Sequence, residues 1–119
     1  MMVPSYKELI GKVGGHMQAL GKDRPELMGS FQKLLGAAEG AGGALDGKTK
    51  ELIALALAVG ARCDPCVGFH AQKLVQLGCT RAELEDMLGV CLVMGGGPSL
   101  MYASSALAAY EEFGGEKAA

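Results

Sequence analysis

Two cysteines, a histidine and a glutamate stand at spacings that let their side chains act together. Cys63 and Cys66 are separated by two residues, which places the two thiols within reach of a disulfide bond. His70 follows Cys66 by four residues, so on a helix its imidazole lies one turn away on the same face. Eleven residues separate Glu51 from Cys63, and its carboxylate could orient the imidazole from a preceding helix.

These side chains are suited to thiol chemistry, because the thiolate is the reactive form of cysteine. His70 is placed to act as a base for Cys66, and Glu51 to orient His70, which is the arrangement of an activated nucleophile. Cys63 stands at the start of a helix, where backbone N–H groups favour negative charge. A sulfenic acid, formed when a peroxide attacks a thiolate, condenses with a second thiol to a disulfide. An external dithiol would reduce that disulfide by exchange.

Two other interpretations of the same residues stay open. Cys63, Cys66 and His70 could be three zinc ligands, with Glu51 as the fourth, although the chain has no second C-x-x-C pair. The cysteines could also be a buried structural pair in a helical module. Both alternatives differ from thiol catalysis in predicting a site without turnover.

The remaining cysteines and the other histidine suggest no chemistry. Cys79 and Cys91 lie among apolar residues and are interpreted as inert fillers of the core. His16 falls in the first predicted helix and is expected to be exposed or to be a satisfied core group.

Composition indicates one small helical domain, residues 1–119. Half of the residues are hydrophobic, 5% are aromatic, and the formal net charge is -2. The low charge and high apolar content exclude disorder, and without a basic stripe no nucleic-acid partner is expected. A chain of 119 residues with mean hydropathy +0.23 has more apolar surface than a small domain buries easily. We therefore expect a homo-oligomer.

The distribution of apolar residues predicts no membrane partner. The longest nearly uninterrupted apolar run covers residues 52–61, whereas a membrane span needs about 20 residues. We interpret this run as a buried helix. The N-terminal residues lack the basic and then apolar layout of a signal peptide, so a cytoplasmic location is expected. There, thiols stay reduced unless they are catalytic or bind metal.

Apolar periodicity predicts an all-α fold of about six helices and no strand of useful length. A glycine-rich stretch at 36–47 is interpreted as a loop or a frayed helix end, and glycines with a proline at 95–98 as the end of the fifth helix. The expected helices cover residues 5–20, 25–35, 48–61, 64–77, 80–94 and 99–113.

Short polar residues mark the expected helix starts. Asp46 is a candidate N-cap of the third helix, and Asp64 of the fourth, with Pro65 as its first helical residue. Thr80 and Glu83 form the capping-box pattern at the start of the fifth helix. These starts place Cys66 and His70 on one helix and Glu51 on the helix before it.

The spacing of the four residues resembles the E-x11-C-x-x-C-x3-H signature of the AhpD-like alkylhydroperoxidases, in the carboxymuconolactone decarboxylase superfamily. Residues 50–56, Lys-Glu-Leu-Ile-Ala-Leu-Ala, are similar to that family's helix before the motif. Residues 94–99, Met-Gly-Gly-Gly-Pro-Ser, followed by Tyr102 and Ala103, resemble the tail of its short members. The resemblance extends over about residues 25–113.

The resemblance implies an all-helical oligomer, commonly a trimer or hexamer, with thiol peroxidase or disulfide reductase activity and no organic cofactor. By position, Cys66 would attack the peroxide and Cys63 would resolve the intermediate, while His70 and Glu51 would relay the proton. The substrate would be a hydroperoxide or a disulfide, and the reductant a dithiol or lipoyl protein. Family members that decarboxylate lactones lack the cysteine pair, which makes a lactone substrate the weaker alternative.

One position departs from the family pattern. Alkylhydroperoxidases often have histidine before the second cysteine, whereas this chain has Pro65. The substitution removes one proton donor from the motif and predicts a lower peroxidase efficiency.

Overall fold

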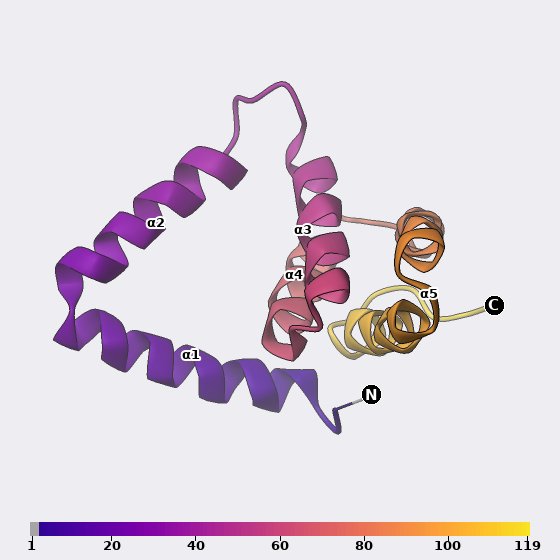
Figure 1. Cartoon of the computed structure of the whole chain (residues 1–119), viewed down its shortest axis with the longest axis horizontal. Coiled ribbons are helices and arrows are strands. Elements are labelled where there is room, and N and C mark those ends of the chain that lie inside the picture. Colours follow the sequence, from indigo (N-terminus) through magenta and orange to yellow (C-terminus); the bar gives the residue numbers. More distant parts are fainter. Residues whose placement is uncertain (1–2) are drawn as a thin grey trace.

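The computed structural model describes residues 3–119, and this part of the chain is all-helical, as predicted (Figure 1). Five helices are present in it, where the sequence suggested about six. They are α1 (Tyr6–Asp23), α2 (Pro25–Glu39), α3 (Gly47–Ala61), α4 (Asp64–Gln76) and α5 (Arg81–Glu112).

Side-chain caps begin four of the helices, and those of α1, α3 and α5 use short polar residues. The side chain of Ser5 accepts a hydrogen bond at the start of α1, and that of Asp46 does so at the start of α3. Thr80 and Glu83 form the predicted capping box at the start of α5. Such caps satisfy backbone N–H groups that have no partner within the helix. The predictions for Asp46 and Thr80 are thus confirmed.

The fifth and sixth predicted helices form one element, α5, with a kink at Gly96. This residue has φ 66° and ψ −149°, a conformation that favours glycine. The chain turns there and resumes the helix at once, with Pro98 in the first turn after the kink, where its missing N–H costs little. The expected interruption therefore exists: the non-helical backbone at Gly96 separates two helical halves, which follow each other without a loop and are counted as one element.

Helix α2 is longer than the glycine pattern predicted. The expected loop over residues 36–47 begins only at Gly40, because α2 continues through Gly36 to Glu39. The N–H of Gly40 still donates to the carbonyl of Gly36, at 2.9 Å. This extra turn carries Glu39 toward α3.

The core lies between α3, α4 and the two halves of α5, with the first turns of α1 packed beside it (Figure 1). Helix α2 lies outside this core and has no buried residue. Most of the buried side chains are aliphatic, and two are tyrosines. The largest fully buried apolar ones are Tyr6, Tyr110, Leu55, Leu74, Leu84, Val59 and Val67.

Helix α1 approaches α4 at a glycine. A Cβ atom added to Gly68 would lie 2.5 Å from Cγ2 of Ile10, so only glycine fits there without a shift of α1. The same end of α1 is tied to the end of α5, because the Glu112 carboxylate accepts hydrogen bonds from the N–H groups of Tyr6 and Lys7. The two ends of the described chain therefore brace α4, which carries the cysteine motif.

Among residues 3–119, α5 alone is long and apolar enough to cross a membrane by length and composition. The sequence pattern does not predict this, because glycines interrupt the segment. The kink at Gly96 divides the 32 residues near their middle, and neither half reaches the roughly 20 residues of a span. Both halves contribute residues to the core, including Leu84, Leu88 and Ala106.

Candidate functional site

Cys63 and Cys66 are joined by a disulfide bond at the start of α4, with their Cα atoms 5.3 Å apart. Cys63, and not Asp64 as predicted, is the N-cap: its backbone is extended and its Sγ accepts a hydrogen bond from the N–H of Cys66 at 3.3 Å. Asp64 and Pro65 instead form the start of the first helical turn. Both cysteines are half-buried. The pair thus lies at a helix N-terminus, where backbone N–H groups stabilise negative charge.

A tight turn at Arg62 presents Cys63 to this position. Arg62 adopts the left-handed conformation, with φ 61°, and ends α3. Its guanidinium donates hydrogen bonds to the carbonyls of Val59 and Gly60, at 2.8 and 2.9 Å. The hydroxyl of Tyr102, on α5, donates to the Arg62 carbonyl at 3.3 Å. These contacts hold an otherwise unfavourable backbone conformation and fix the angle between α3 and α4.

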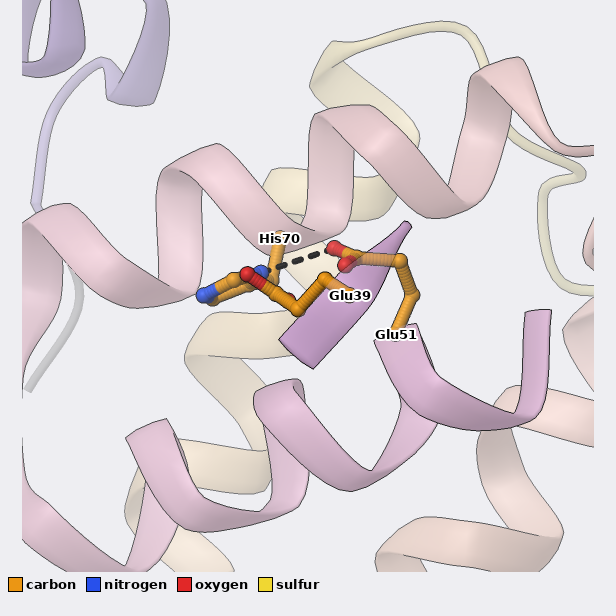
Figure 2. A group of neighbouring side chains, drawn as sticks. All are labelled: Glu39, Glu51 and His70. Atoms are coloured by element: carbon orange, nitrogen blue, oxygen red, sulfur yellow. Dashed lines mark hydrogen bonds and ion pairs between the residues drawn. The ribbon is translucent and has the colours of Figure 1, made fainter. Parts of the chain in front are cut away.

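His70 and Glu51 meet as the spacing predicted. Nδ1 of His70 lies 2.7 Å from Oε1 of Glu51 (Figure 2). Glu51 lies on α3 and is only 7% exposed. Because a carboxylate can only accept, Nδ1 carries the proton in this pair, and Nε2 is the ring nitrogen left for proton exchange. Cys66 lies one turn before His70 on α4. The site therefore combines a disulfide, an oriented imidazole and a buried carboxylate.

A third member of the cluster, Glu39, was not predicted. Figure 2 shows its side chain converging with those of Glu51 and His70 from the end of α2. Burial raises the pKa of Glu39, and a hydrogen bond with Glu51 and the charge of that carboxylate raise it further. No sequence signal links residue 39 to the motif, because the surrounding glycines indicated a loop. Its presence depends on how α2 packs against α3.

The side chains that could hold a metal differ from the predicted ligand set. Ligand atoms of Glu39, Glu51 and His70 all lie within 4.8 Å of one another. The zinc alternative instead required the sulfurs of Cys63 and Cys66, and the disulfide bond engages both of them. That ligand set is not assembled in this structure.

Comparison with known families decides the classification. The sequence model of the carboxymuconolactone decarboxylase family matches residues 25–109. The chain belongs to this family. The match confirms the resemblance seen in the motif and contains all four predicted site residues as well as Glu39.

A solved member of the carboxymuconolactone decarboxylase family has the same fold. The crystal structure of apo-lpg0406, a family protein from Legionella pneumophila, matches with a TM-score of 0.88 and 51% identity, covering 91% of this chain and 96% of that one. Uncharacterized proteins of Cupriavidus necator and Haemophilus influenzae are 40% and 38% identical, each over 92% of this chain and 96% of the relative. The likeness therefore extends over nearly the whole chain.

The two remaining cysteines of this family member are separate from the motif. Cys79 and Cys91 are free thiols buried in the core, as predicted. Burial raises the pKa of both thiols, which favours the unreactive protonated form. His16 is exposed on α1. These cysteines therefore provide internal references for the reactivity of the motif.

Proposed function

We propose that this protein is a thiol oxidoreductase that cycles Cys63 and Cys66 between a dithiol and a disulfide and reduces hydroperoxides or disulfides. The observation that carries the proposal is the disulfide at the N-terminus of α4, one turn from an imidazole bonded to a buried carboxylate. A disulfide at a helix start beside an acid–base pair is suited to exchange chemistry. Membership of a family that includes thiol peroxidases supports the same conclusion.

In the proposed reaction with a hydroperoxide, the Cys66 thiolate attacks the terminal peroxide oxygen and the O–O bond breaks. The thiolate becomes a sulfenic acid, and the leaving alkoxide takes a proton to give an alcohol. The Cys63 thiol then attacks the sulfenic sulfur, which forms the disulfide and releases water. An external dithiol restores both thiols through a mixed disulfide and is itself oxidised. With a disulfide substrate, the first attack occurs on sulfur and no water forms.

We assign the attacking thiol to Cys66 because His70 follows it at helical spacing. His70 would accept the Cys66 proton at Nε2 and later deliver it to the leaving oxygen. Glu51 would hold the ring through Nδ1 and stabilise the imidazolium. Pro65 offers no side-chain proton at this position, which makes the imidazole the expected proton source.

The proposed reductant is a dithiol, either a protein or a lipoyl group, because the disulfide needs two electrons from thiols. We further propose a homo-oligomer, a trimer or hexamer, in the cytoplasm, with no nucleic-acid or membrane partner. Large apolar side chains remain exposed on α1, α2, α3 and α5 and support assembly. They include Leu27, Phe31 and Leu34 on α2, Leu57 on α3, and Val90, Val93 and Met94 on α5.

The test is consumption of cumene hydroperoxide with dithiothreitol or dihydrolipoamide as donor. Wild type should turn over, Cys66→Ser should not, and Cys91→Ala, which changes a thiol outside the site, should retain activity if folded. Equal inactivity of wild type and Cys66→Ser with every peroxide, disulfide and donor tried would end the proposal. Elemental analysis separates the metal-binding alternative, which requires about one metal ion per chain and thiols protected from alkylation.

A further inference from the structure

Glu39 is the one carboxyl of the cluster for which the proposed reaction has no role. Glu39 is the last residue of α2, whereas Glu51 lies on α3 and His70 on α4 (Figure 2). The three side chains place ligand atoms within 4.8 Å of one another. Two carboxylates at this distance repel each other, so they are stable together only when they share a proton or face a cation.

The surroundings of Glu39 favour the shared proton. Its Oε1 is buried, and no N–H or O–H group of residues 3–119 donates a hydrogen bond to it. From α3 it faces the Glu51 carboxyl, whose oxygen lies within 4.8 Å of its own, and from α4 it faces His70 and Lys73. Two carboxyl groups this close can hydrogen-bond to each other only when one of them carries a proton. The His70 imidazole and the Lys73 ammonium lower the pKa of Glu39 and so favour its ionised form.

A hydrogen bond holds the end of α2 beside α3, where Glu39 can approach Glu51. The Lys50 ammonium donates a hydrogen bond at 2.9 Å to the carbonyl of Gly40, the residue after Glu39. Lys50 immediately precedes Glu51 on α3. The bond therefore sets the end of α2 against the same turn of α3 that carries the buried carboxylate. Elsewhere, α2 has no buried residue.

We propose that Glu39 is a positioning residue of the dithiol site. Glu39 shares a proton with Glu51, and this sharing sets how strongly the Glu51–His70 pair draws the proton from Cys66. The inference rests on the proposed thiol function. While Glu39 holds its proton, it donates to Glu51 and weakens the hold of that carboxylate on the imidazole. When Cys66 transfers its proton to Nε2 of His70, the S–H bond breaks, the electron pair stays on sulfur, and the new positive charge favours release of the Glu39 proton to solvent.

The size of the effect follows from the separation of the charges. At 4.8 Å, the upper bound of the separations in this cluster, a negative charge changes the proton affinity of an imidazolium by about 0.6 pH units at a dielectric constant of 80 and by about 2.5 units at 20. Glu39 is only partly buried, so an intermediate value applies. A residue 39 that cannot ionise should therefore move thiolate formation at Cys66 to higher pH by about one unit.

The experiment is the pH dependence of Cys66 alkylation by iodoacetamide in reduced protein, measured by peptide mass for each cysteine. Glu39→Gln should raise the pH of half-maximal alkylation by about one unit, whereas Glu26→Gln, in the exposed first turn of the same helix, should leave it unchanged. Glu39→Asp keeps an ionisable group and should lie closer to wild type than Glu39→Gln. A purely structural role would give the opposite order, because glutamine matches glutamate better in size.

The outcomes separate this inference from the proposed function. Profiles of Glu39→Gln and wild type that superimpose, while wild type consumes hydroperoxide, would overturn the role of Glu39 and leave the function standing. A shifted profile in a protein that reduces no peroxide or disulfide would support the role of Glu39 and end the function. Thermal unfolding of each variant identifies those that fail to fold.

Discussion

Replacing Glu51 by glutamine removes the charge that orients and supports His70 while keeping nearly the same shape. Glu51 is 7% exposed and its Oε1 lies 2.7 Å from Nδ1 of His70. A hydrogen bond to a charged group contributes about 1.5–3 kcal/mol. The His70 side chain is 25% exposed, so solvent screens part of this interaction energy. We therefore use about 1.5–2 kcal/mol for the Glu51–His70 hydrogen bond. Since about 1.4 kcal/mol is tenfold, the Cys66 reaction at pH 7 should slow by about 10- to 30-fold.

The assay is the rate of Cys66 alkylation in reduced protein at pH 7, together with hydroperoxide turnover. Asp86→Asn, which removes an exposed carboxylate on α5, is the matched control and should react as wild type does. Cys79 and Cys91 in the same sample report whether the variant has opened its core. If Glu51→Gln reacts at the wild-type rate while His70→Ala does not, the orienting role of Glu51 is refuted.

Three further predictions concern the fold and the assembly. Gly68→Ala places a Cβ against Ile10 and should lower the unfolding free energy by about 1–3 kcal/mol in thermal or denaturant unfolding, whereas Gly60→Ala, with open space around its Cβ, should not destabilise. Burial acts to raise the pKa of Glu112, but the hydrogen bonds that its carboxylate accepts at the start of α1 outweigh burial and lower the pKa. The stability that Glu112 contributes is therefore complete above pH about 4.3 and is lost as the pH falls through the lowered pKa. Glu112→Gln should remove this part of the acid sensitivity of unfolding. Sedimentation should give a multiple of 12.2 kDa, and Val93→Glu, at a side chain 85% exposed, should shift it toward smaller species, whereas a wild-type mass of 12.2 kDa would contradict assembly.

The parts of the site that follow from local periodicity could be predicted from the sequence. Cys66 and His70 share a face because four residues make about one helical turn. Glu51 could be assigned because the motif spacing matches a known family, although its burial depends on packing. The start of α4 was predicted one residue late, because Asp64 and Pro65 are favourable at two neighbouring positions. Local preference does not decide between them, whereas the disulfide and the turn at Arg62 do.

Contacts between distant segments could not be predicted in the same way. Glu39 reaches the site only because α2 continues through a glycine-rich stretch and its end is held by Lys50. Helix propensity alone disfavours that continuation, since glycine costs about 1 kcal/mol relative to alanine. At Gly96 the sequence indicated an interruption, but the immediate return to a helix is decided by the packing of both halves of α5 on the core.

The position of the disulfide within one helical turn has a consequence for folding. A bridge stabilises mainly by restricting the unfolded chain, and the restriction grows with the loop that it closes. Here the sequence separation is 3, so the bridge restricts the unfolded chain by about 2 kcal/mol, against nearly 5 for a 100-residue loop. The bridge does not link one helix of the core to another. Under the proposed function, each opening and closing of the bridge would therefore leave most of the stability of the protein untouched, with the core as a constant scaffold.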